Sequence, residues 1–333
     1  MGAGVMQEAA SRAEPRPPAQ HLLARHAEDV LWLARYVERI ENLARILDVT
    51  HTFSRDGGER DGRNWLAILR INDDQQRFFE RHAEANLRSV GHFYLLDRGN
   101  PTSIQAAIEA ARENARTLRA LISTEMWLQI NVFHGRIRVL NEADLAPENL
   151  SRICAMLKEG CQAHAGITEG TFYRDQSWRF YALGRHLERA DQTMRLVDVG
   201  YHTLRAATDS GSEIDSAQWI TLLRAAAGYH AYHRTHPAGF SILDVIAFLL
   251  LDRAFPRSVS LNLEQVGRHL ERLASRHLLP MGAALERLQG MRAMLDERSV
   301  EEGVRQGLSL VLDRMQAQIG ALYGDVAQAV FAA

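Results

Sequence analysis

Apolar residues recur every three or four positions along most of the chain, and this is the spacing of amphipathic helices. The first such stretch starts near residue 22 and ends near Ser54, before a polar turn. Its apolar positions are Leu33, Val37, Ile40, Ala44 and Leu47. Strand-type alternation of apolar and polar residues is scarce. The pattern therefore predicts an all-α fold, a multi-helix bundle.

Further helices follow from the same spacing and from capping signals. Thr102 and Gln105 resemble a capping box, Ser123 or Thr124 caps the next helix, and Pro147 stands at the start of another. The predicted helices span about 65–71, 73–96, 102–122, 123–141, 147–170, 171–204, 215–233, 241–253, 260–278, 280–295 and 298–330. The longest apolar run, 245–251, is far too short to cross a membrane.

Three blocks of sequence occur twice, in the same order. The pairs are Arg35–Val49 with Arg185–Val199, Trp65–Arg70 with Trp219–Arg224, and Phe93–Ile104 with Phe248–Val259. Their offsets of 150, 154 and 155 residues are nearly constant, which indicates an internal duplication packed with pseudo-two-fold symmetry. We expect a disordered leader at 1–20, a first repeat at 21–170 and a second repeat at 171–333.

Charged residues are the part of the first block that stays the same in both copies. Six of its fifteen aligned positions are identical, and five of the six are charged. These are Arg35/Arg185, Glu38/Glu188, Arg39/Arg189, Arg45/Arg195 and Asp48/Asp198. Core positions tolerate apolar exchanges if volume is kept, whereas charges on a plain solvated face have no reason to stay fixed. The retained charges therefore indicate a constraint.

A charged stripe results when the first block is placed on a helix. Arg35, Glu38, Glu41, Arg45 and Asp48 lie on one face, with Leu33, Ile40 and Leu47 roughly opposite. One hypothesis is a structural ion-pair network between the two long helices. The other is a site in which arginines bind a carboxylate or phosphate while acidic residues bind an amine or act as general base.

The functional hypothesis assigns a role to each member of the stripe. The predicted catalytic residues are Glu38, Glu41, Glu188 and Asp191. The predicted substrate-binding residues are Arg35, Arg45, Asp48, Arg185, Arg195 and Asp198, with Arg112, Asn114 and Arg116 from the charged helix near 111–127. The block from Asp97 to Ser103 is better explained as a helix end, a turn and the next N-cap.

Composition narrows the chemistry. The net charge is −2, so the chain has no basic excess for nucleic acid, and we expect neither a nucleic-acid nor a membrane partner. Lys158 is the only lysine among 39 basic residues, which argues against an ordinary ATP site and against Schiff-base chemistry elsewhere. Cys154 and Cys161 lie about 10 Å apart along one helix, too far for a disulfide, and free thiols are typical of the cytoplasm.

No phosphate-binding, dinucleotide-binding, nucleophile-elbow or zinc-protease motif occurs, and we expect no cofactor. A carboxylate-rich metal site at Glu38, Glu41 and Asp48 lacks the Glu-x-x-His pairs of di-iron bundles. His230, His233 and His236 are spaced loosely for one helix face and are followed by Pro237. We therefore expect no metal.

The segments LLARHAEDVLWLARYVERIENLARILDV, ARENARTLRALISTEMW, TFYRDQSWRFYALGRHLERADQTMRLVDV and FLLLDRAFPRSV together resemble the bacterial alpha-E family. The resemblance covers nearly the whole chain from about Leu22. Ala34 stands where the family would be expected to have Gly, and the second copy has Gly184 at the equivalent position. The resemblance implies an all-helical partner of a circularly permuted ATP-grasp ligase and of a transglutaminase-like protein, in a setting of peptide-like amide bond formation.

Two functions remain open at this point. In the first, the chain is an accessory subunit or enzyme of the ATP-grasp system and binds an acidic or acyl-phosphate substrate on the stripe. In the second, it is a helical scaffold that docks the ligase, and the stripe is a structural ion-pair network. The sequence does not decide whether the chain is an enzyme. An accessible cavity beside the charges would favour the first, and complete burial and pairing the second.

Overall fold

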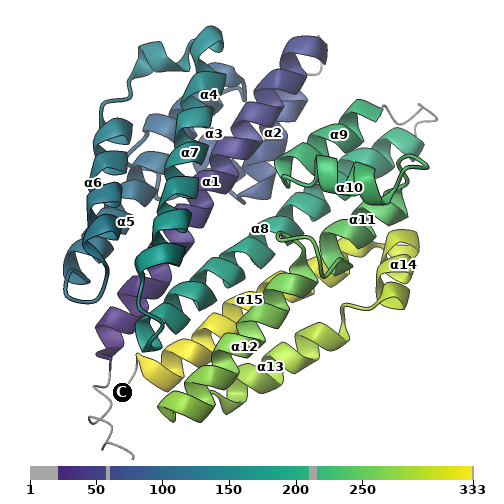
Figure 1. Cartoon of the computed structure of the whole chain (residues 1–333). Coiled ribbons are helices and arrows are strands. Elements are labelled where there is room, and N and C mark those ends of the chain that lie inside the picture. Colours follow the sequence, from purple (N-terminus) through teal and green to yellow (C-terminus); the bar gives the residue numbers. More distant parts are fainter. Residues whose placement is uncertain (1–21, 58–60, 210–215, 332–333) are drawn as a thin grey trace, which may run out of the picture.

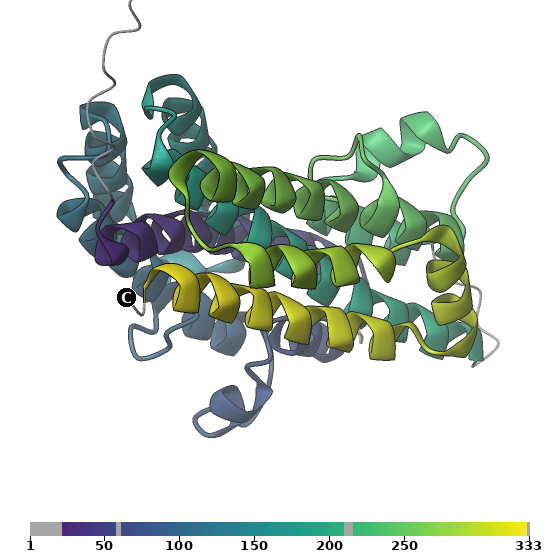
Figure 2. The same ribbon diagram turned by 90° about the horizontal axis from the view of Figure 1, so that it is seen from below.

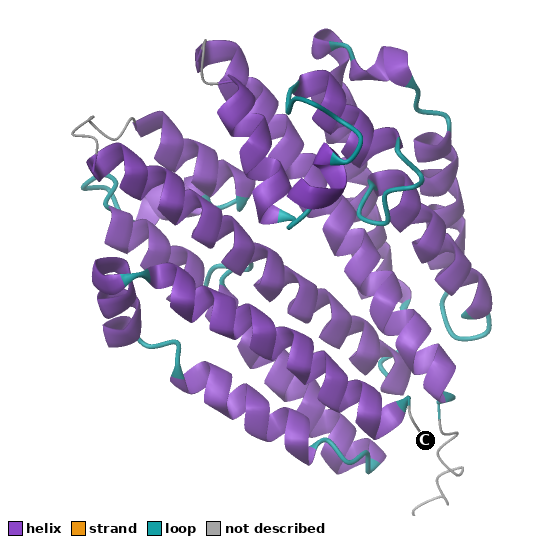
Figure 3. Ribbon diagram, turned by 180° about the vertical axis from the view of Figure 1, so that it is seen from behind, coloured by secondary structure: helices purple, strands orange, loops and turns teal. Residues whose placement is uncertain are grey.

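Helices joined by loops build the fold. A computed structural model describes residues 22–57, 61–209 and 216–331. No strand occurs within these ranges (Figure 3), and the predicted all-α class is confirmed. The predicted leader at 1–20 lies outside the described residues.

Two long helices form the centre of the molecule (Figure 1). They are α1 (Ala24–Gly57) and α8 (Gln176–Asp209), the two helices that carry the charged stripe. They pack against each other and run in the same general direction, because residues of rising number on α1 meet residues of rising number on α8. We call this interface the junction.

Each long helix has a group of three further helices, of which the first and the third pack directly on it and the second packs on those two. Around α1 these are α5 (Ile104–Thr117), α6 (Thr124–Arg138) and α7 (Pro147–Thr171). Around α8 they are α12 (Val259–His277), α13 (Gly282–Ala293) and α15 (Leu308–Val330), which lie side by side in Figure 2. The molecule therefore has two helix groups, and the junction joins them.

Short elements connect the long ones in a matching order. The first group has α2 (Asp61–Ile71), α3 (Gln75–Phe79), α4 (Leu87–Gly91), the π-helix η2 (His92–Leu96) and the 3₁₀-helix η3 (Glu142–Leu145). The second group has α9 (Ser216–Ala225), α10 (Tyr229–Thr235), α11 (Ile242–Leu251) and α14 (Glu297–Gln306). Ser103 and Ser258 cap the helices that follow, α5 and α12, through the same hydrogen bond.

Backbone conformation agrees between the halves at an unusual place. Asp73 after α2 and Ala227 after α9 both adopt left-handed backbone, with φ of 56° and 58°. Such a conformation is uncommon outside glycine, and the two residues lie at the offset found in the sequence. We call residues at such equivalent places counterparts. The common origin of the halves and the domain boundaries stay predictions.

Several predicted helix limits were wrong. The stretch predicted at about 73–96 is divided into α3, α4 and η2, and the one predicted at about 215–233 is divided into α9 and α10. Ser103, not Thr102, is the N-cap of α5, because its hydroxyl accepts from the amide of Ala106. The helix predicted at about 298–330 is broken at Gly307, whose φ of 134° ends α14 and starts α15 in a new direction.

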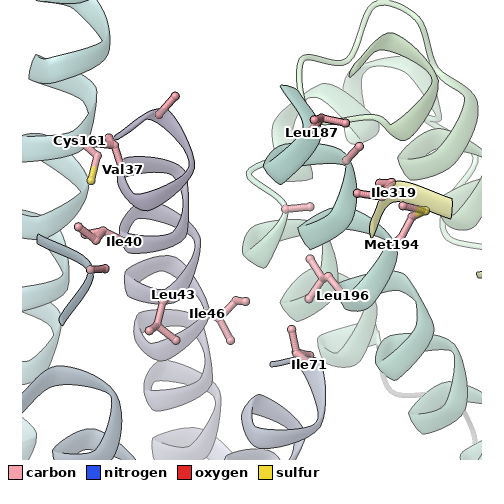
Figure 4. Close-up of a cluster of buried hydrophobic side chains, with 14 of the residues drawn as sticks. Val37, Ile40, Leu43, Ile46, Ile71, Cys161, Leu187, Met194, Leu196 and Ile319 are labelled. Carbon is pink, nitrogen blue, oxygen red and sulfur yellow. The ribbon is translucent and has the colours of Figure 1, made fainter. Parts of the chain in front are cut away.

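Apolar side chains fill the space between the helices of each group. Figure 4 shows Val37 and Ile40 of α1 beside Cys161 of α7, and Met194 of α8 beside Ile319 of α15. Across the junction the backbones come very close: a Cβ on Gly184 would lie 2.2 Å from the carbonyl oxygen of Leu31. Among the described residues no helix is long and apolar enough to span a membrane.

Candidate functional site

Charged residues pair reciprocally across the junction. Arg39 donates from Nε to Oε1 of Glu188 at 2.5 Å. Its counterpart Arg189 donates to both carboxylate oxygens of Glu38, the counterpart of Glu188. Each Glu-Arg dipeptide thus binds the other across the helix interface, which is the arrangement that the predicted pseudo-two-fold symmetry would produce.

Burial makes these pairs strong. Glu188 is fully buried and also accepts from Nε of Arg35 at 2.7 Å. Burial alone would raise the pKa of Glu188, but the guanidinium groups of Arg35 and Arg39 outweigh it and lower the pKa to about 2. Burial likewise opposes a lowered pKa at Glu38, where Arg189 and Arg257 prevail. Both carboxylates are therefore charged and held inside the protein.

A third arginine fills the junction beside Glu38. Arg257, in the turn before α12, donates from Nη1 to Oδ1 of Asn42 at 2.6 Å and from Nη2 to Oε1 of Glu41 at 2.7 Å. Its Nη1 also lies 3.6 Å from Glu38, and the side chain is only 10% exposed. Glu41 accepts a further bond from Arg45. We call this side of the junction, with Glu38, Glu41 and Arg257, the closed end.

On the opposite side, which we call the open end, the counterpart of Arg257 is Thr102, and a cavity of about 260 Å³ lies there. We call it the junction cavity. Its polar lining consists of Arg39, Asn72, Asp73, Asp74, Arg77, Thr102, Asp191, Gln192 and Arg195. Three arginines and three aspartates therefore face a space that is open to solvent.

One wall of the cavity is organised around Asp74. The carboxylate of Asp74 is buried and accepts from Nη1 of Arg77 at 2.7 Å, from the hydroxyl of Thr102 at 2.7 Å and from the hydroxyl of Tyr94 at 3.1 Å. Burial raises the pKa of Asp74, while the bonds from Thr102 and Tyr94 oppose that rise. These bonds fix the wall before any ligand arrives.

The opposite wall belongs to α8. Arg195 donates from Nε to Oδ2 of Asp191 at 3.0 Å, and Nε2 of Gln192 donates to Glu188 at 3.2 Å. Burial raises the pKa of Asp191, and the charge of Arg195 only partly offsets this. A buried carboxylate with a raised pKa is suited to accept a proton or a cationic donor.

The structure brings most of the predicted stripe into one network. Arg35, Glu38, Glu41, Arg45, Glu188, Asp191 and Arg195 all take part in the ion pairs of the junction. Arg185 lies nearby, its guanidinium 5.8 Å from the ring of Trp178 and its Nε buried without a hydrogen-bond partner. Of this stripe, only Asp191 and Arg195 line the junction cavity.

Five predicted residues lie apart from the junction network. Asp48 pairs with Lys158 of α7 at 2.6 Å, and Asp198 lies 3.8 Å from His202.

On α5, Arg112 donates to Asn131 of α6, Asn114 to the carbonyl of Asp29, and Arg116 to Glu113. The first two contacts hold α5 against α6 and α1, and the third lies within α5. None of the three residues lines the junction cavity.

Several residues of the site were not predicted as functional. These are Arg39, Asp74, Arg77, Thr102, Gln192 and Arg257. Arg39 could have been found, because it is identical with Arg189 in the repeat. The contrast between Thr102 and Arg257 was also visible in the aligned blocks, as a place where the copies differ. In the part of the chain that the structure describes, no group of three or more His, Cys, Asp or Glu could hold a metal ion.

Comparison with known proteins places the whole described fold in one family. A family described as a predicted alpha-helical domain with a conserved ER motif matches residues 22–331. An uncharacterized protein of Mycobacterium bovis is 25% identical over 91% of this chain, and one of Mycobacterium tuberculosis is 24% identical over the same share. The chain spans only 36% of the length of these relatives. No solved structure matches it.

Proposed function

Since the chain belongs to the Alpha-E family, we propose that it is the helical subunit of an ATP-grasp amide-ligase system and that the junction cavity holds part of the substrate. The partner is a circularly permuted ATP-grasp protein, with a transglutaminase-like protein as a further component. The amide-ligase setting rests on family resemblance. The observation that carries the site is the cavity itself, where Asp191 and Arg195 of the charged stripe face a ligand-sized space.

The lining suits the two groups that form an amide. Guanidinium groups of Arg39, Arg77 and Arg195 offer donors to a carboxylate or acyl phosphate delivered by the ligase. Asp191 offers a carboxylate that holds the substrate bearing the attacking amine. The chain needs no lysine for this chemistry, because ATP is bound by the partner.

Two further features fit this proposal. The longer relatives indicate that such a domain works joined to other domains, as a ligase subunit would. Cys154 and Cys161 are free and buried, which is typical of the cytoplasm, where ATP-dependent ligation takes place.

A second candidate function is a scaffold that docks the ligase without binding its substrate. The observation in its favour is the closed end of the junction, where Glu38 and Glu41 are buried and paired with arginines. Buried, fully paired charges fix helix geometry and offer nothing to a ligand. In our proposal this end is structural and only the open end binds substrate.

Two counterpart arginines separate the proposals. Arg195 lines the cavity, whereas Arg45 makes the same i,i+4 pair on α1 and does not. We would reconstitute the chain with its ATP-grasp protein and follow ADP release and amide products by mass spectrometry. Arg195→Gln should lower product formation at least about tenfold, the worth of a charged hydrogen bond, with folding and docking retained.

The comparison variants are Arg45→Gln and Arg268→Gln, the latter on an exposed pair of α12. A loss with Arg195→Gln that exceeds the loss with Arg45→Gln supports the cavity as the site. Equal losses would mean that the stripe acts as a whole. Full turnover with folded, docked Arg195→Gln would leave the scaffold as the better explanation.

A further inference from the structure

The two ends of the junction offer the same framework with different contents. On α1, Glu41 and Asn42 hold the guanidinium of Arg257. Their counterparts on α8 are Asp191 and Gln192, which line the junction cavity. The place of the Arg257 side chain is left open, because its counterpart Thr102 is too short to fill it.

The open end keeps two acceptors that are unused within the described residues. Asp191 accepts from Arg195 through Oδ2 only, so Oδ1 has no donor there. Gln192 donates through Nε2 to Glu188, so its Oε1 accepts nothing. At the closed end, Arg257 binds the amide oxygen of Asn42 and the carboxylate oxygen of Glu41 that also accepts from Arg45.

The chemistry of the acceptor pair is preserved although its residues differ. Asp191 is one methylene shorter than Glu41, and Gln192 is one methylene longer than Asn42. A carboxylate and an amide oxygen therefore remain side by side, and the planar fork of a guanidinium matches two adjacent acceptors.

The neighbouring wall has been rebuilt from apolar to polar. At the closed end, Phe255 packs over Gly228, where a Cβ would already be 3.0 Å from its ring. The counterparts at the open end are Asn100 and Asp74, joined through the hydroxyl of Thr102 at 2.7 Å to each. A buried carboxylate and an amide thus stand where the closed end has a glycine and an aromatic ring.

We propose that the junction cavity binds a guanidinium group, that of an arginine residue in a small peptide or of free arginine, through Asp191 and Gln192. The ligand takes the position that Arg257 occupies at the other end. This inference deepens the proposed function and rests on it for the ligand's role as substrate, since an arginine derivative would bring its own amine or carboxylate into the cavity.

Nearby arginines do not oppose such a ligand. At the closed end, Arg257 is bound although Arg45 and Arg189 stand at the same carboxylates. The open end has the counterparts Arg195 and Arg39, and it gains two carboxylates, Asp73 and Asp74, against one further guanidinium, Arg77. Its balance of charge is therefore at least as favourable to a cation as that of the end that holds one.

The probe is N-acetyl-L-argininamide, measured by isothermal titration calorimetry against the full chain at low ionic strength. The citrulline analogue has the same shape without the charge, and the lysine analogue has the charge without the fork. We expect the arginine probe to bind at least about tenfold more tightly than either, because citrulline donates without charge and lysine lacks the planar fork that reaches both acceptors. Free arginine and arginine tripeptides then distinguish the two sources of the group.

Two variants localise the binding. Asp191→Asn removes the carboxylate, and Thr102→Arg supplies an internal guanidinium that competes for its place. Both should reduce binding of the arginine probe at least about tenfold, while Glu264→Gln, on an exposed i,i+4 pair, should not. Circular dichroism melting verifies that each variant is folded. If Asp191→Asn does not fold, the binding measured with Thr102→Arg tests the guanidinium site.

The outcomes separate this inference from the proposed function. Equal binding of the citrulline or lysine probe, or binding that persists in folded Thr102→Arg, overturns the guanidinium site. If no arginine probe binds but Arg195→Gln still abolishes ligation, the ligand class is wrong and the proposed function stands. If the probe binds as expected and Thr102→Arg ligates at the wild-type rate, the guanidinium site stands and its use in ligation does not.

Discussion

The closed and open ends of the junction are built on the same two helices, yet one is protein core and the other a cavity. Both have a buried glutamate bound by the arginine of the opposite Glu-Arg dipeptide. Among their differences is the turn before α12 and α5, which has Arg257 in one half and Thr102 in the other. The long side chain of Arg257 fills the closed end, and the short side chain of Thr102 leaves the open end unfilled.

The shared part of the two ends is structural. Two reciprocal pairs lock α1 and α8 in register, because a shift of either helix would leave a buried glutamate without its partner. A ligand at the open end therefore meets a rigid frame. The part that differs carries the function in our proposal, and it is the part that the following changes would alter.

Arg257→Thr should have the largest effect. The substitution places at the closed end the residue that the open end has. It removes the hydrogen bonds that Arg257 donates to Glu41 at 2.7 Å and to Asn42 at 2.6 Å. Removing one partner of a buried ion pair costs about 3–5 kcal/mol of unfolding free energy. Urea unfolding followed by circular dichroism measures it.

The matched change at the open end is Thr102→Ala, which removes one hydroxyl that donates at Asp74. We expect a loss of about 1 kcal/mol. A loss for Arg257→Thr as small as that for Thr102→Ala would mean that Arg257 is not what closes its end.

Acid should weaken both ends through their glutamates. The pKa of Glu188 is lowered to about 2 from its usual value near 4.5, because two arginines outweigh its burial. A lowered carboxyl pKa stabilises the fold above pH 4.5, and this stabilisation is lost as the pH falls towards 2. The loss amounts to about 3 kcal/mol for this one group.

Unfolding free energy measured from pH 6 to pH 2 tests this, with Glu188→Gln and Glu38→Gln as isosteric comparisons. Each variant should start less stable and depend less on pH across this window. A steep dependence that survives in both variants would place the acid-sensitive groups elsewhere.

Close backbone contact is another point where the halves differ. Gly184 on α8 has no room for a Cβ, which would lie 2.2 Å from the backbone oxygen of Leu31. Its counterpart on α1 is Ala34, which is buried without strain. Gly184→Ala should therefore cost about 2–3 kcal/mol by overpacking, measured by urea unfolding. Ala34→Gly should cost only about 1 kcal/mol, the loss of helix propensity; similar costs would indicate that the junction moves apart to admit the methyl group.

The fold could be predicted from the sequence because the signals for helices lie within the helix and at its two ends. The spacing of Leu33, Val37 and Ile40 defines a buried face, and Pro147 and Ser123 mark helix starts where the structure has them. The break at Gly307 was missed, because a single glycine inside a helical pattern does not distinguish a break from a tolerated residue.

The site was harder to predict, because it depends on contacts between residues far apart in the chain. The stripe identified Glu38 and Glu188, but nothing in its spacing showed that each is bound by the arginine beside the other. Arg39 points across the junction and not along its own stripe. The cavity depends on Thr102, and only the packed helices show that a short side chain there leaves a space beside Asp191.

The smallest expected effect is also the sharpest test of the comparison. Thr102→Arg copies the closed end onto the open one, where Oδ1 of Asp191 and Oε1 of Gln192 lack donors among the described residues. Two charged hydrogen bonds, less the ordering of the long side chain and the loss of the Thr102–Asp74 bond, leave a gain of about 1 kcal/mol. The melting temperature should then rise by about 2 °C. Thr102→Met is the control, because it adds volume without charge. A gain for methionine equal to that for arginine would show that the open end lacks only bulk. A gain confined to arginine would show that it is built around a missing guanidinium.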